Sequence, residues 1–134
     1  MSVSFPFKEE SSSIFGKVHR PIAEVFFKHA KKEVWQPVIM IIDTGADYTM
    51  LPLFLTEPLG IDLKHDCRII ETQGVGGKSK VFLTNNKIKV RIGRSERKIP
   101  LGFLSHDYIP PLLGRQEFFE TFKVTFKKFR TTFE

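Results

Sequence analysis

The chain has 134 residues, with 21 Lys and Arg against 15 Asp and Glu, a net charge of +6, and a single cysteine. This length corresponds to one ordinary domain and is too short for two enzyme lobes. The lone Cys67 excludes an internal disulfide framework and a Cys-rich zinc site. The longest apolar run, residues 38–42, is far shorter than the roughly 20 residues of a membrane-spanning helix. Residues 1–6 lack the features of a signal peptide, so we expect one soluble, cytoplasmic domain.

The first half of the chain is predicted to consist mainly of short β-strands. Residues 1–16 are rich in serine and are expected to form an N-terminal arm or a short first strand, ahead of a domain at residues 17–134. Residues 21–27 begin with a proline and continue with β-branched and aromatic residues, as strands often do. Residues 34–42 end as a continuous apolar run, which predicts a strand buried on both faces. Residues 52–63 are expected to hold a short turn of helix.

The next segment has the pattern of a β-hairpin. Residues 68–72 and 80–84 favour strands, and they flank a loop at residues 73–77 with glycines at its tip. Residues 87–93 alternate charged and β-branched side chains, which predicts a strand with one face in water.

The C-terminal segment fits two patterns. Its phenylalanines recur at steps of three and four, as in an amphipathic helix, yet Phe122, Val124 and Phe126 alternate with polar residues, as in a strand. We expect a short helix at residues 115–120 followed by a strand. The predicted architecture is therefore mostly β, with one or two small helices.

A candidate site follows directly after the apolar run, in Asp43-Thr44-Gly45-Ala46-Asp47. A carboxylate at the end of an apolar strand is costly to bury, so it requires hydrogen bonds or a function. Thr44 can supply a hydroxyl, and Gly45 allows another backbone or a substrate to come close. The alternative is a turn that Asp43 initiates and that caps the next segment, which is the commoner origin of an isolated Asp-Thr-Gly.

A second motif lies near the C-terminus, where residues 110–113, with the sequence Pro-Pro-Leu-Leu, precede Gly114 and Arg115. The order of this motif, the Asp-Thr-Gly segment and the glycine hairpin resembles that of the retropepsin-like aspartic proteases. These are single-domain relatives of the retroviral proteases, and they include free-standing bacterial and archaeal members. The resemblance covers residues 21–126 and implies a mostly β fold, closed and antiparallel like a barrel, with one short C-terminal helix.

The resemblance implies that Asp43 is the catalytic aspartate, with Thr44 in a hydrogen-bonded brace across a dimer and Gly45 in contact with the substrate backbone. The reaction needs two carboxyl groups that share a proton, one activating water and one protonating the peptide carbonyl. The chain has only one Asp-Thr-Gly, so the resemblance implies a homodimer with Asp43 of each subunit on the two-fold axis. Ala46 has no hydroxyl to stabilise the charged form, and we expect a dyad that works nearer neutral pH than stomach-type enzymes.

Further roles follow from the same resemblance. Asp47 and Arg115 would form an ion pair that supports the site beside Gly114. The glycine hairpin would be a flap that closes over an extended peptide, bound as an added strand. The substrate-binding residues that the resemblance implies are Ala46, Asp47, Gly74, Val75, Gly76 and Gly77. Residues 78–80 are more polar than the corresponding segment of viral members, which leaves the substrate preference open.

Other readings of the chain stay open beside the aspartic endopeptidase. One is a non-catalytic peptide-binding or assembly module on the same fold. Another is a basic, nucleic-acid-binding β-domain, because Lys and Arg cluster at residues 91–98 and, interleaved with Phe126 and Phe129, at residues 123–130. Such runs are more often solvated faces. The four histidines have no metal-ligand spacing, so no metal and no cofactor are expected.

Overall fold

Residues 2–74 and 77–134 are described by a computed structural model and contain fourteen strands, one α-helix and two 3-10 turns. Most of the strands belong to one large sheet. In chain order they are β4 (Ile22–Lys28), β5 (Trp35–Ile42), β6 (Thr49–Leu51), β7 (Cys67–Gly74), β8 (Gly77–Thr84), β9 (Ile88–Ile92), β10 (Ser95–Ile99), β11 (Leu101–Leu104) and β12 (Leu112–Leu113). Their order in the sheet is β10-β9-β4-β5-β12-β6-β11-β8-β7. The helical elements are η1 (Leu53–Thr56), α1 (Leu63–Asp66) and η2 (Phe119–Thr121).

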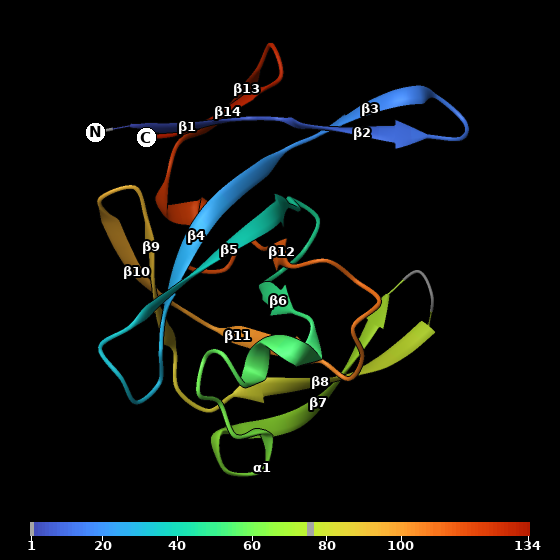
Figure 1. The fold of residues 1–134 in the computed structure, drawn as a ribbon. Helices are drawn as coiled ribbons and strands as arrows, with labels where there is room; N and C mark the ends of the chain where they lie inside the picture. Colours follow the sequence, from blue (N-terminus) through green and yellow to red (C-terminus); the bar gives the residue numbers. More distant parts are fainter. Residues whose placement is uncertain (1, 75–76) are drawn as a thin grey trace.

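The remaining strands form two small sheets near the chain termini. The bounds of these strands are β1 (Val3–Pro6), β2 (Lys8–Ser12), β3 (Gly16–Arg20), β13 (Val124–Lys127) and β14 (Arg130–Phe133). β1, β14 and β13 form a three-stranded sheet in that order, while β2 and β3 pair only with each other among the described strands. Figure 1 shows the two termini side by side and the β2–β3 hairpin projecting from the opposite side of the molecule.

The core follows from strict alternation along the central strands. In β4 the side chains of Ala23, Val25 and Phe27 are fully buried, whereas the residues between them are half-buried on the other face. Four phenylalanine rings close the core beneath the terminal sheet, through edge-on contacts of Phe118 with Phe119 and Phe133 and a tilted contact of Phe118 with Phe122. The terminal sheet is thus packed on the same core as the large sheet.

Most strands appear where the sequence predicts them, and the mostly β class is confirmed. Three details differ. The sheets formed by residues 2–74 and 77–134 are not closed into a barrel. β5 is not buried on both faces, because Ile39 is 51% exposed on its outer face. The C-terminal helix is only the single 3-10 turn η2, because Glu117 has φ 57° and a helix cannot pass through a left-handed residue. None of the helices among the described residues is long and apolar enough to cross a membrane.

Candidate active site

The two sequence motifs meet because β5 and β12 are parallel neighbours. Ile42 lies opposite Leu113 in this pair, so both strands end at the same edge of the sheet. Asp43 follows β5 and Gly114 follows β12, and the backbone N–H of Asp43 donates to the carbonyl of Leu113 at 3.0 Å. Segments about seventy residues apart are thereby joined at one point.

Asp43 begins a tight turn that leaves its carboxyl group accessible. The N–H of Gly45 donates to Asp43 Oδ1 at 3.0 Å, and the N–H of Ala46 donates to the Asp43 carbonyl at 3.2 Å. Asp43 is half-buried, and Thr44 and Gly45 are exposed. The turn that Asp43 initiates is therefore present, but it leads into an exposed loop rather than capping a helix. The arrangement presents a carboxyl group and an exposed backbone at an open surface.

Arg115 connects both ends of this loop. Its guanidinium donates through Nη2 to Asp47 Oδ1 at 2.6 Å and through Nη1 to the carbonyl of Thr44 at 2.5 Å. The backbone N–H of Arg115 also donates to the carbonyl of Ala46 at 3.0 Å. The side chains of Arg115 and Asp47 are 45% and 77% exposed, so in the single chain this ion pair contributes little free energy. Its effect is geometric, because one planar group holds two points of the loop.

Gly114 is needed because the chain passes unusually close to Tyr48 there. A Cβ at this position would lie 2.3 Å from the Tyr48 carbonyl. The N–H of Gly114 donates to Oγ1 of Thr49, which is fully buried, at 3.2 Å. Sequence reasoning assigned no role to Tyr48 or Thr49. A threonine directly before two apolar residues was the available signal, since a buried hydroxyl needs a partner.

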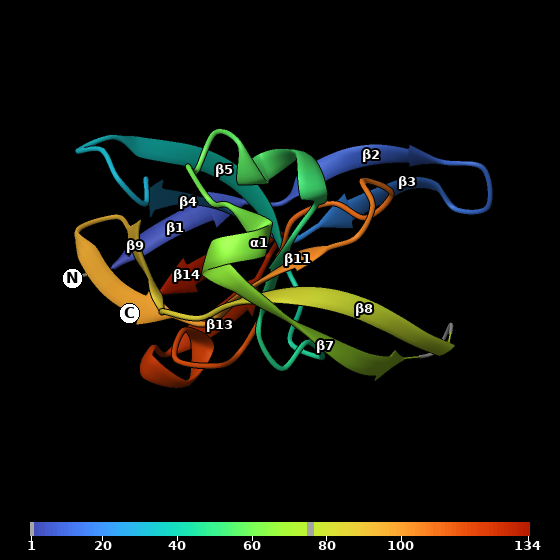
Figure 2. The ribbon, with the colours of Figure 1, turned by 90° about the horizontal axis from the view of Figure 1, so that it is seen from below.

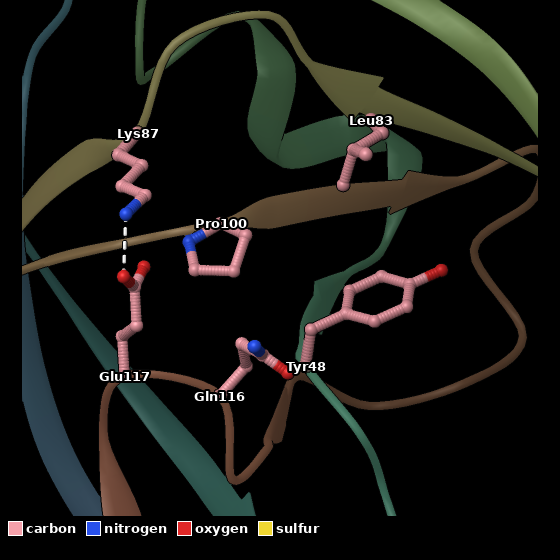
Figure 3. A pocket seen from close by; sticks show the side chains of 6 residues that line it. All are labelled: Tyr48, Leu83, Lys87, Pro100, Gln116 and Glu117. Atoms are coloured by element: carbon pink, nitrogen blue, oxygen red, sulfur yellow. Dashed lines mark hydrogen bonds and ion pairs between the residues drawn. The ribbon is translucent and has the colours of Figure 1, made fainter. Parts of the chain in front are cut away.

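Tyr48 forms one wall of a cavity of about 310 Å³ beside the loop, which Figure 3 shows from close by. The lining also includes the ion pair of Lys87 with Glu117, but it does not include Asp43, so the cavity is separate from the candidate catalytic carboxyl group. The lining residues are Tyr48, Leu83, Lys87, Pro100, Gln116 and Glu117. The Tyr48 hydroxyl is buried with no hydrogen-bond partner among the described residues. Burial, and to a lesser degree the charge of Asp47, raise the pKa of Tyr48.

The glycine hairpin is a long antiparallel pair, β7 with β8, in which Gly74 lies opposite Gly77. Val75 and Gly76, which the sequence places at its tip, lie outside the described residues. Gly77 has φ +103°, which a residue with a side chain rarely adopts. Figures 1 and 2 show the hairpin extending well beyond the body of the sheet. Its role as a flap stays a prediction.

Two arginines of the first basic cluster make contacts within the chain. Arg91 donates to Glu96 at 2.7 Å, and its guanidinium lies 4.2 Å from the centre of the Trp35 ring. The guanidinium of Arg97 lies 4.2 Å from the centre of the Phe122 ring. These cation–π contacts cover aromatic surface on the molecule itself. They give both arginines a structural role that needs no nucleic acid.

Comparisons with known proteins agree with this geometry. The family described as aspartyl protease matches residues 32–116. A retropepsin-like aspartic protease from Rickettsia conorii superposes with a TM-score of 0.68 at 19% identity, covering 98% of each chain. EIAV protease, in complex with the inhibitor HBY-793, superposes with a TM-score of 0.53 at 24% identity, covering 72% of this chain and 82% of that one. No curated protein sequence matches the chain. The chain belongs to the aspartyl protease family and has the retropepsin-like fold.

Proposed function

We propose that the protein is an aspartic endopeptidase that acts as a homodimer, with the two Asp43 carboxyl groups meeting on the two-fold axis. The observation that carries the proposal is the accessible Asp43 turn, held at the end of β5 by hydrogen bonds from the N–H groups of Gly45 and Ala46 and supported by Arg115. Membership of the aspartyl protease family supports the same activity. Because one chain has a single Asp-Thr-Gly, a second copy must supply the second carboxyl group.

The chemistry of such a pair follows from the shared proton. Two carboxyl groups in contact cannot both ionise at low cost, so one Asp43 is charged and the other is protonated. The charged group takes a proton from a water molecule, whose oxygen attacks the carbonyl carbon of the peptide. The protonated group donates its proton to the carbonyl oxygen. The proton taken from water then passes to the nitrogen, and the C–N bond breaks as the C=O bond re-forms and an O–H proton returns to the carboxyl pair. No metal or cofactor enters these steps.

The terminal sheet supports pairing of two copies. β13 lies at an edge of this sheet, so its outer N–H and C=O groups lack a neighbouring strand among the described residues. Phe126 on this strand is exposed. An edge strand with an exposed aromatic side chain is suited to pairing with the same strand of another copy. Such pairing would hold the two Asp43 loops in a fixed relation.

The substrate is proposed to be an extended peptide beneath the β7–β8 hairpin. Exposed Gly45 leaves room for a substrate backbone beside Asp43, since a Cβ there would lie 3.3 Å from Asp43 Oδ1. The proposed flap residues are Gly74, Val75, Gly76 and Gly77, followed by the exposed polar residues Lys78 and Ser79. A flap of this kind closes over the peptide and excludes water from the reacting bond.

The test combines native mass spectrometry with cleavage of a peptide library. Asp43→Asn keeps the size of the side chain and removes the carboxyl group, so we expect a folded dimer without cleavage activity. Asp66→Asn, which makes the same change in α1, is the matched control and should cleave like the wild type. If Asp43→Asn cleaves as well as the wild type, the proposed function is wrong. A wild-type dimer that binds peptides without cleaving them would instead identify a binding module.

A further inference from the structure

The β2–β3 hairpin stands apart from the rest of the molecule (Figure 1). Its strands form a sheet of their own, and neither strand contains a buried residue. A two-stranded hairpin without a core is marginally stable in water. Exposed ion pairs such as Glu10 with Arg20, at 2.6 Å, join its strands but contribute little free energy. Neither a core nor a strong ion pair within residues 8–20 therefore explains the length of the hairpin.

The tip of the hairpin carries two adjacent large apolar side chains. Ile14 is 80% exposed and Phe15 is 76% exposed. The turn itself is made by other groups, since Ser12 Oγ accepts from the N–H of Ile14 and of Phe15, each at 3.2 Å, and Gly16 adopts φ +76°. The Ile14 and Phe15 side chains are not needed for the turn. Adjacent exposed apolar side chains of this size indicate a surface that another molecule covers.

The base of the hairpin is held in a defined direction. The His19 ring stacks on the Phe129 ring, with 4.1 Å between their centres. The Phe7 ring packs edge-on against Phe126 and Phe129, and the Phe7 N–H donates to the carbonyl of Phe129 at 2.8 Å. These contacts tie the hairpin to the β13–β14 hairpin. The projecting tip is thus set on a fixed base rather than on a loose linker.

The direction of the hairpin points to its partner. Figures 1 and 2 both show β2–β3 projecting on the side to which the β7–β8 hairpin also extends. β5, which leads to Asp43, runs toward the same side in Figure 1. In the proposed homodimer the Asp43 loops of two copies meet, so each hairpin reaches toward the other copy. A two-fold axis then gives two identical contacts.

We propose that the β2–β3 hairpin is a clasp, whose Ile14 and Phe15 side chains dock on a second copy of this chain. The proposal rests on the homodimer of the proposed function. It adds an interface outside the catalytic loop, the flap and the terminal sheet. The length of the hairpin suits this task, because the five residues of β2, Lys8–Ser12, extend about 16 Å before the turn begins.

The test is the double variant Ile14→Ser/Phe15→Ser, examined by analytical ultracentrifugation. The turn is expected to persist because Ser12 and Gly16 are unchanged, and circular dichroism verifies that the fold is intact. We expect the dissociation constant of the dimer to rise by about 100-fold or more, as the loss of two buried apolar side chains on each copy predicts. The matched control, Phe54→Ser/Ile69→Ser, removes two exposed apolar side chains of η1 and β7 and should leave the constant within about three-fold.

The outcomes separate this proposal from the proposed function. A tip variant that dimerises like the wild type, or a control that weakens the dimer equally, overturns the clasp and leaves the homodimer intact. A wild type that stays monomeric at all concentrations overturns both. Photo-crosslinking from benzoylphenylalanine at position 15 gives a second measurement, in which we expect a covalent dimer. A tip that instead binds phosphatidylserine vesicles, with no crosslinked dimer, also overturns the clasp.

Discussion

The substitution Gly114→Ala tests the closest backbone approach near the candidate site. An added Cβ would lie 2.3 Å from the Tyr48 carbonyl carbon and oxygen, and 2.8 Å from the Tyr48 Cα. Backbone atoms cannot rotate away, so one segment must shift by about 1 Å to reach van der Waals distance. Overpacking of this kind costs about 1–3 kcal/mol. The shift also lengthens the 3.2 Å bond from Gly114 to Thr49, which adds about 1 kcal/mol. We expect the free energy of unfolding to fall by roughly 2–4 kcal/mol.

The matched control is Gly102→Ala. Its Cβ would come within 2.7 Å of Val81 Cγ1 and 2.8 Å of Tyr48 Cε2. Both are side-chain atoms rather than backbone. Val81 is fully buried and β-branched, so it yields little, but the Tyr48 ring can shift, and we expect a loss of about 1–2 kcal/mol. Urea unfolding at one fixed protein concentration measures both variants, because dimer stability depends on concentration. A Gly114→Ala variant within roughly 0.5 kcal/mol of the wild type, or one no worse than Gly102→Ala, would refute the reasoning.

Three further predictions concern the site. Tyr48→Phe should leave the free energy of unfolding unchanged or raise it by up to about 1 kcal/mol, because the buried hydroxyl has no hydrogen-bond partner in the described part of the chain. A fall in the free energy of unfolding of more than about 1 kcal/mol would contradict this prediction. Arg115→Lys should slow peptide cleavage about ten-fold or more while changing the free energy of unfolding by less than about 1 kcal/mol, since its exposed pair with Asp47 mainly orients the loop. Unchanged cleavage would be the contrary result. The cleavage rate should peak nearer neutral pH than that of stomach-type enzymes and fall on either side, because the Asp43 pair works with one shared proton and Ala46 offers no hydroxyl. An optimum at about pH 2–3, or a rate still rising in strong alkali, would contradict it.

Strands with a local pattern were predictable from the sequence. β4, the β7–β8 hairpin and β9 lie where alternation and glycine placement put them. The prediction that β5 is buried on both faces was wrong. An apolar composition does not distinguish a strand with two buried faces from a strand whose second face is exposed in a single chain. The predicted helix at residues 115–120 was wrong because Glu117 adopts a left-handed conformation, which is uncommon for glutamate and cannot be predicted from its residue type.

The candidate site was predictable only as far as its motifs are local. Asp43, Gly114 and Arg115 were identified by their motifs, and the ion pair expected between Asp47 and Arg115 is present. Their adjacency depends on the parallel pairing of β5 with β12, which periodicity does not reveal. Thr49 was not predicted because its role is to accept a hydrogen bond from Gly114, which lies sixty-five positions away in the sequence. Contacts of this range are set by topology.

Assembly would change the energetics of the candidate site. In a single chain the Arg115–Asp47 pair is largely exposed, and such pairs contribute at most about 1 kcal/mol. If a second copy covers the exposed Thr44 and Gly45, the same guanidinium loses water, and the hydrogen bonds to Asp47 and to the Thr44 carbonyl become necessary to offset that loss. Removal of Arg115 should therefore weaken the dimer more than it destabilises the monomer. The pair that looks minor in one chain would then couple assembly to the geometry of the catalytic loop.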